Sequence, residues 1–148
     1  MPYSCNKKQR QCQRGYTSGA PEVYAFETLL HDHHSGERIH AVKVGKCGRW
    51  SVRLSNYKRR HLGQASRFEL VDPGWDSMIH VPVNGMAEAS VAEALTSMIL
   101  KRVLKLETPK NLREYYLGVD LSMVAAVLNS AAASANVTVA QFLQLGIV

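Results

Sequence analysis

Residues 23–44 read VYAFETLLHDHHSGERIHAVKV and decide the fold class of this chain. Two runs rich in β-branched and aromatic side chains flank a polar stretch, and its Ser35-Gly36 pair is typical of a turn. We predict strands over Val23–His31 and Arg38–Val44, joined as an antiparallel hairpin. The first run is apolar at consecutive positions, which indicates a strand covered on both faces.

The segment that follows predicts a third strand. Residues 45–48 (Gly-Lys-Cys-Gly) suit a second turn, and apolar and polar residues alternate along Arg49–Tyr57. Trp50, Val52 and Leu54 would point toward the core, because side chains alternate between the two faces of a strand. The N-terminal half is therefore expected to be a three-stranded antiparallel meander.

A long amphipathic helix is predicted in the second half, after an irregular segment with a short extended piece at Met78–Val83. Ser90 and Glu93 have the spacing of a capping box that opens a helix, and Thr108-Pro109 would end it. Apolar residues recur at helical spacing on one face. They are Val91, Leu95, Met98, Ile99 and Val103.

The C-terminal segment predicts a strand followed by a helical hairpin. Leu112–Leu121 has strand character, and Ser122 can cap a helix that runs to about Ala135. Asn136 would turn the chain, and Thr138 would cap a closing helix. The predicted fold class is therefore α+β: a three-stranded antiparallel meander, a long amphipathic helix and a C-terminal strand–helix–turn–helix.

Length and composition fit one domain. The chain has 148 residues, of which 46% are hydrophobic and 20% charged. Residues 1–21 have few apolar groups to bury, so we expect a mobile basic arm. Residues 22–148 would form a single α+β domain, with a basic β-rich half (22–85) and a mostly helical half (86–148).

Cysteine usage and the absence of a secretory pattern favour the cytoplasm. Three cysteines are an odd number without a compact framework, which fits a reducing compartment. The first 16 residues are polar and basic, without the apolar core of a secretory signal. Leu121–Val148 is uncharged, but its asparagine, serine, threonine and glutamine residues argue against a membrane span.

Charge is distributed unevenly along the chain. Residues 1–70 hold 13 lysines and arginines against 5 acidic residues, whereas residues 71–148 hold 5 against 7. A basic half joined to a weakly acidic half indicates an anionic partner: nucleic acid, an acidic protein surface or an anionic membrane. Of these we expect nucleic acid or an acidic protein surface, and no membrane.

The basic residues concentrate around the third predicted strand. Each lysine or arginine that neutralises a phosphate releases a counterion, so an array of this kind suits a polyanion. Arginine can also grip one phosphate at two points. The candidate binding residues are Lys43, Lys46, Arg49, Arg53, Tyr57, Lys58, Arg59 and Arg60.

Histidine and cysteine suggest zinc, but their spacing does not support a site. His31 and His33 are the weak candidates, and the meander places them some 20 Å from Cys47 on the second strand. Cys5 and Cys12 lie on the arm, with a gap too long for a zinc knuckle. We therefore expect no metal and no other cofactor.

Catalytic motifs are also missing from the sequence. Asp72 and Asp76 are a close acidic pair beside the basic half, and Cys47 with His40 is the plausible thiol–imidazole pair. Neither is joined by a glycine-rich phosphate loop or a nucleophile elbow. We therefore expect that this protein is not an enzyme.

Residues 113–148 resemble the ribbon–helix–helix module of Arc-type repressors, in strand–helix–turn–helix order. In that family two copies pair their strands and interlock their helices into a dimer. Glu114 and Asp120 would stand on the base-reading face here, so the resemblance implies the dimer rather than the DNA contact. The expected seam between two copies consists of Val127, Ala131, Phe142 and Leu143.

These features predict a non-enzymatic nucleic-acid-binding or regulatory protein that contacts the phosphate backbone through a basic sheet face. The alternative is a small inhibitor or adaptor of the phage anti-defence kind (anti-CRISPR-like), which docks on an acidic surface of a protein or nucleoprotein complex. That comparison rests on size and charge alone.

Overall fold

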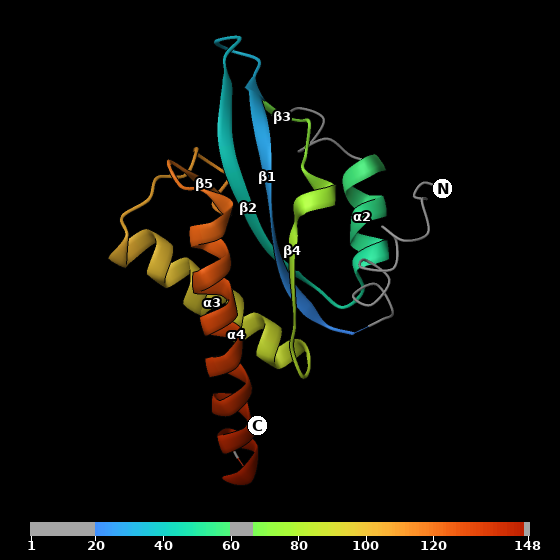
Figure 1. Ribbon diagram of the computed structural model, residues 1–148, viewed down its shortest axis with the longest axis vertical. Helices are drawn as coiled ribbons and strands as arrows, with labels where there is room; N and C mark the ends of the chain where they lie inside the picture. The colour runs from blue at the N-terminus through green and yellow to red at the C-terminus, as the bar shows by residue number, and fades with distance from the viewer. Residues whose placement is uncertain (1–19, 60–66, 147–148) are drawn as a thin grey trace.

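The computed structural model describes residues 20–59 and 67–146, and in this part of the chain five strands form one antiparallel sheet. The strand order is β3-β1-β2-β5, with β4 also paired to β1 (Figure 1). The strands are β1 (Glu22–Asp32), β2 (Arg38–Cys47), β3 (Phe68–Val71), β4 (Ile79–Pro82) and β5 (Tyr115–Leu117).

The predicted hairpin is present and forms the centre of the sheet. β1 and β2 pair in an unbroken register from Glu22 opposite Cys47 to His31 opposite Arg38. Gly36 in the connecting turn has a φ of +78°, a conformation that glycine adopts without strain. The structure therefore confirms an antiparallel α+β fold, while several finer expectations are wrong.

Helices cover both faces of the sheet. They are α2 (Trp50–Arg59), α3 (Met86–Met98), the π-helical turn η2 (Ile99–Val103) that continues α3, and α4 (Leu121–Gln144); η1 (Trp75–Ser77) is one 3-10 turn. Val23 and Ala25 of β1 lie in a core with α3 and α4. Tyr24 and Phe26 pack with Trp50 of α2 on the opposite face. The chain is thus layered as helices, sheet and helix (Figure 1).

The third strand of the predicted meander is wrong, because residues 50–59 form α2. Trp50, Leu54 and Tyr57 also recur at helical spacing, and all three pack on the aromatic side of the sheet. Val52, which the alternation placed in the core, is 55% exposed. The segment satisfied both periodicities, and burial of three side chains on one helix face decided between them.

The long helix starts earlier than predicted, and its predicted face is only partly buried: Val91 and Leu95 pack against the core, but the fully buried positions are others. α3 begins at Met86, four residues before the expected capping residue, and its buried face is formed by small side chains. The buried residues of the α3–η2 helix include Ala89, Ala92, Thr96 and Leu100. Small side chains allow close packing against α4, whereas Met98 and Val103 of the predicted face are 46% and 67% exposed.

The expected C-terminal helical hairpin is a single helix. α4 runs without a break through Asn136, whose side-chain oxygen accepts a hydrogen bond from the Asn84 backbone at 3.1 Å. Asp120, rather than Ser122, caps the helix, because its carboxylate accepts from the Met123 N–H at 2.9 Å. The expected strand before it is reduced to β5.

By length and composition α4 could cross a membrane, but core helices of soluble proteins pass the same test. Six of its side chains are buried against the rest of the chain, from Val124 to Val139. Its C-terminal end extends beyond the sheet (Figure 1). α4 is therefore packed against the rest of the chain along part of its length and has an exposed end.

Asp32 connects the hairpin turn to Arg67, the residue just before β3. Its two carboxylate oxygens accept hydrogen bonds from the Arg67 guanidinium at 2.8 and 2.7 Å, and one also accepts from the His34 N–H. The hydrogen bonds from Arg67 hold the pKa of Asp32 well below its usual range.

We expect Asp32→Asn to destabilise the protein at pH 7 and to destabilise it less at pH 3. A carboxylate whose pKa is lowered in the folded state contributes its full stability above its unfolded pKa of about 3.9, and loses it as the pH falls toward the folded value. Thermal melting at both pH values measures the difference. Asp76→Asn, at an exposed aspartate, is the control, and a pH-independent difference for Asp32→Asn would contradict the expectation.

Candidate functional site

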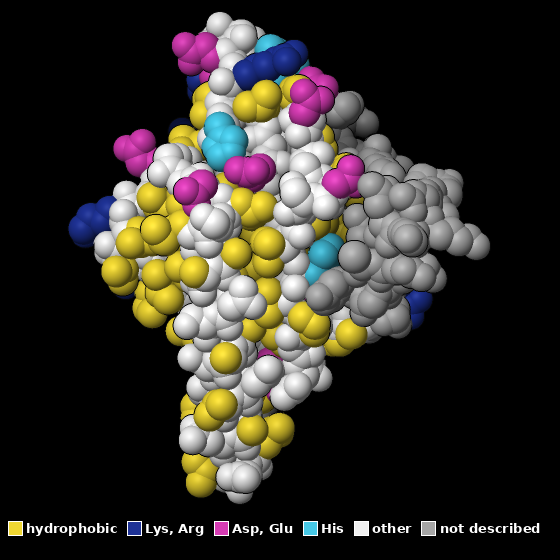
Figure 2. Space-filling view, in the orientation of Figure 1, with side chains coloured by type: hydrophobic (Ala, Val, Ile, Leu, Met, Phe, Trp, Pro, Cys, Tyr) yellow, Lys and Arg dark blue, Asp and Glu magenta, His cyan; other side chains and the backbone are white. Residues whose placement is uncertain are grey.

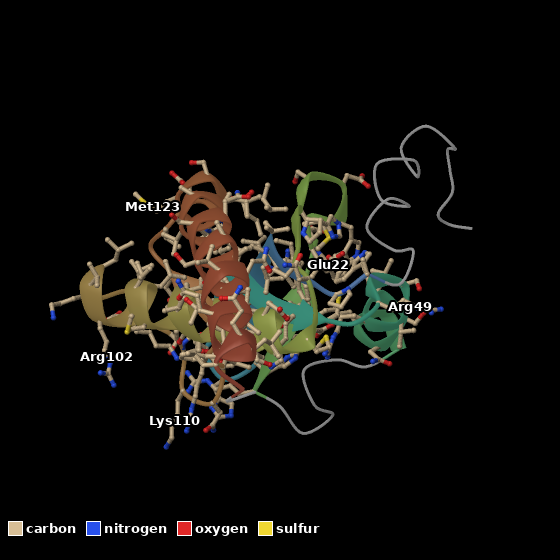
Figure 3. The ribbon with its side chains drawn as sticks, turned by 90° about the horizontal axis from the view of Figure 1, so that it is seen from below. Glu22, Arg49, Arg102, Lys110 and Met123 are labelled. Atoms are coloured by element: carbon tan, nitrogen blue, oxygen red, sulfur yellow. The ribbon has the colours of Figure 1, made fainter. Side chains whose placement is uncertain are left out.

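The structure divides the predicted basic residues between different surfaces. Arg53 is exposed on α2, and Arg49 is exposed at the position just before α2, one helical turn away. In Figure 3 Arg49 points outward, on the opposite side of the molecule from Arg102 of η2. Lys58 and Arg59 belong to α2, but their side chains lie outside the described part of the chain, as does Arg60. The basic face is therefore helical and not a sheet face.

Two of the predicted phosphate ligands are already neutralised by acidic residues. Lys43 is buried and forms an ion pair with Glu114, which corrects the expectation that it is exposed. Burial lowers the pKa of Lys43, and the attraction of Glu114 opposes that shift. Lys46 pairs with Glu93 of α3 at 3.0 Å. These lysines contribute less free charge to a partner than the arginines at the start of α2 do.

A cavity of about 540 Å³ lies between α2 and the β5 edge of the sheet. It brings together three of the predicted residues, Lys43, Arg53 and Tyr57. The other residues around it were not predicted. They are Asn111, Leu112, Arg113, Glu114 and Tyr115. We call this the cationic pocket, and it is the candidate site.

Aromatic packing fixes the position of α2 over this pocket. The Tyr57 hydroxyl is 2.8 Å from the Tyr24 hydroxyl, and its ring meets Phe26 edge-on at 5.5 Å between centroids. Tyr57 therefore packs against the core. The prediction that its ring is exposed is wrong. Trp50 is buried as expected and packs on Tyr24 at 4.9 Å. Arg53, between these anchors, donates to the Lys46 carbonyl at 3.3 Å.

Tyr115 contributes a buried hydroxyl to the pocket. Pairing of β2 with β5 sets Tyr115 opposite Lys43, whose amino group lies 5.0 Å from the ring centroid. The hydroxyl has no hydrogen-bond partner among residues 20–59 and 67–146. Burial raises the pKa of Tyr115, with further contributions from Tyr57 and Glu114, so the phenol remains protonated and able to donate.

Comparison with known proteins does not identify this arrangement. No family model matches the chain, and comparison with curated proteins and with solved structures finds no match either. Function is therefore inferred from the residues of this chain alone.

The histidines of the described residues do not form a metal site. No group of three or more histidine, cysteine or acidic side chains in that part of the chain could hold a metal ion. His31 and His33 stack edge-on at 4.8 Å, and His33 pairs with Glu69 at 3.2 Å. Cys5 and Cys12 lie outside the described residues.

The proposed thiol–imidazole pair is separated by the sheet. Cys47 lies opposite Glu22 on the α2 side, whereas His40 lies opposite Leu29 on the other side. His40 instead bonds to Glu27 at 3.1 Å. Burial raises the pKa of the Cys47 thiol to about 12, so the nucleophilic thiolate is scarce at neutral pH.

We expect Glu114→Gln to lower stability at pH 7 by about 1–2 kcal/mol, because Lys43 then remains buried without its counter-charge, while solvent screens part of the pair. The pKa of Lys43 would fall further, so the loss should shrink as the pH rises through that lowered pKa. Denaturant unfolding at pH 7 and pH 10 tests this.

The matched control is the double variant Lys43→Met with Glu114→Gln. It removes both charges from the site, so it should be more stable at pH 7 than Glu114→Gln alone. If the double variant is the less stable of the two, the ion pair is not what Glu114 contributes.

Proposed function

We propose that this chain is a non-enzymatic nucleic-acid-binding or regulatory protein that contacts the phosphate backbone through Arg53 of α2 and Arg49 just before that helix. The observation that supports the proposal is the pair Arg49 and Arg53. Both are exposed, Arg49 just before a helix held by buried aromatic rings and Arg53 one turn into it, and neither forms an ion pair with a described residue. Arginine so presented binds phosphate oxygens through two parallel N–H groups.

The spacing of these arginines suits one continuous anionic chain. Residues four apart on a helix lie about 6 Å apart along its axis, so both side chains can meet neighbouring phosphates. Arg113 extends the cationic surface from α2 to the loop before β5. Backbone contact is favoured over base stacking, because Tyr57 is packed inside and Phe142 is the exposed aromatic among the large exposed hydrophobic residues of the described chain.

The rival proposal, an inhibitor or adaptor docked on an acidic surface of a protein or nucleoprotein complex, uses the same arginines. Carboxylates would take the place of phosphates, and the salt dependence would be weaker because condensed counterions are released from nucleic acid. Comparing binding of DNA, RNA and an acidic protein at several salt concentrations separates the two proposals.

Self-association is proposed through the free end of α4. Val127 and Ala131 of the expected seam pack within the chain's own core, but Phe142 and Leu143 are 42% and 54% exposed. Hydrophobic side chains also gather at this projecting end in Figure 2. A second copy would cover this apolar surface, and two-fold pairing is the commonest way of doing so.

For the binding proposal, Arg49→Ala and Arg53→Ala should each reduce the slope of log K against log salt by about 0.9 for duplex DNA, or about 0.7 for a single strand. Fluorescence anisotropy with a labelled oligonucleotide measures this. Arg102→Ala is the matched control, since it removes an exposed arginine on the other side of the molecule. Unchanged affinity and slope in the double variant Arg49→Ala, Arg53→Ala would rule out the proposed contact.

For self-association, we expect the wild-type chain to have the mass of a dimer in light scattering at micromolar concentration. The double change Phe142→Glu with Leu143→Glu should give the monomer mass without loss of helix, because both side chains are exposed. Ser134→Glu, at an exposed polar position of α4, is the control. A monomeric wild-type chain would disprove the dimer.

A further inference from the structure

The charge of the cationic pocket exceeds what the chain itself neutralises. Lys43, Arg53 and Arg113 line the pocket together with one carboxylate, Glu114. Three positive side chains against one negative side chain leave two positive charges in a cavity of about 540 Å³. Arg113 forms no ion pair with a described residue. A small dianion would balance this charge.

Tyr115 gives a second, independent indication of a ligand. Its hydroxyl is buried and has no hydrogen-bond partner in the described chain, although a buried donor without a partner costs folding free energy. Its raised pKa keeps the proton on the oxygen at neutral pH. An anionic oxygen in the pocket would accept this proton in a charge-assisted hydrogen bond.

We propose that the cationic pocket binds the terminal phosphomonoester of a nucleic-acid strand. A phosphomonoester carries a charge of about −1.5 to −2 at pH 7, which matches the excess in the pocket better than the single charge of an internal phosphodiester. This inference rests on the proposed function, in which Arg49, just before α2, meets internal phosphates of the same strand.

A neighbouring cavity of about 720 Å³ favours a nucleotide over a phosphate group alone. The two cavities share Asn111 and Leu112, so they lie side by side along the loop before β5. Ile39, Phe68 and Leu117 give the larger cavity an apolar lining. The sugar and base of a terminal nucleotide can contact this lining while the phosphate occupies the cationic pocket.

The experiment compares oligonucleotides of one sequence that carry a 5′-phosphate, a 3′-phosphate or hydroxyls at both ends. We expect one phosphorylated end to bind about tenfold more tightly than the hydroxyl form, because it adds charge-assisted hydrogen bonds. Millimolar inorganic phosphate should abolish that preference. A phosphoserine peptide of matched net charge serves as the competing partner class.

Variants assign the preference to the pocket. Arg113→Ala and Tyr115→Phe should bind phosphorylated and hydroxyl strands nearly equally. Tyr115→Phe should keep or raise the melting temperature, since it removes a hydroxyl without a described partner. Arg49→Ala should weaken both strands alike and keep their ratio, and Arg102→Ala should change neither.

The possible failures of the two proposals are distinguishable. Equal affinity of the wild-type chain for phosphorylated and hydroxyl ends would overturn the pocket assignment, while a weaker Arg49→Ala variant would still support backbone binding. Tighter binding of the phosphopeptide than of any strand would overturn the nucleic-acid ligand. A full preference that persists in both Arg113→Ala and Tyr115→Phe would place the phosphate elsewhere and refute the inference.

Discussion

Burial of β1 on both faces is the constraint on which the rest of the structure depends. Val23 and Ala25 need an apolar cover on one side of the sheet, and Tyr24 and Phe26 need one on the other. All four are at most 1% exposed, so neither cover can be absent. α3 and α4 supply the first and α2 supplies the second. The position of α2, and with it Arg53, therefore follows from the composition of a single strand.

α2 and the candidate site lie on the same face of the sheet. Phe26 and Lys43 stand opposite each other in the hairpin, and Tyr115 stands opposite Lys43 on its other side. Aromatic rings fill this face beneath α2, and the polar groups begin where α2 no longer covers it. A change that loosens the aromatic packing would thus be felt in the pocket, because Tyr57 belongs to both.

Local sequence signals predicted the hairpin correctly. They failed where contacts between residues far apart in the sequence determine the secondary structure. The Ser35-Gly36 turn lies between two apolar runs, so strand positions follow from neighbouring residues alone. Residues 50–59 obey periods of both 2 and 3.6, and the choice needed Tyr24 and Phe26 from another strand. Two of the four buried residues of α3 are alanines, which carry a weak hydrophobic signal.

The remaining misses have the same origin. Asn136 has the chemistry of a turn residue, but the neighbouring alanines and valines continue the helix, and its side chain bonds to Asn84, 52 positions away. Three of the eight residues around the candidate site, Lys43, Arg53 and Tyr57, could be found from basic clustering. Arg113 and Tyr115 could not, because Lys43 and Glu114 meet across 71 positions of sequence through the β2–β5 pairing.

The arrangement of strand lengths also bears on aggregation. β1 and β2, the two long strands, are interior, and the strands outside them are three or four residues long. β3 and β4 pair with different parts of the same edge of β1. Between these two parts, the Gly74 N–H donates a hydrogen bond to the Glu27 carbonyl. β4 ends in a proline, which cannot donate to a further strand. In the described residues the apolar strand β1 therefore offers almost no open edge to another molecule, whereas β5 pairs with β2 over Ala41–Lys43 and leaves the ends of that strand as the place where a further strand could add.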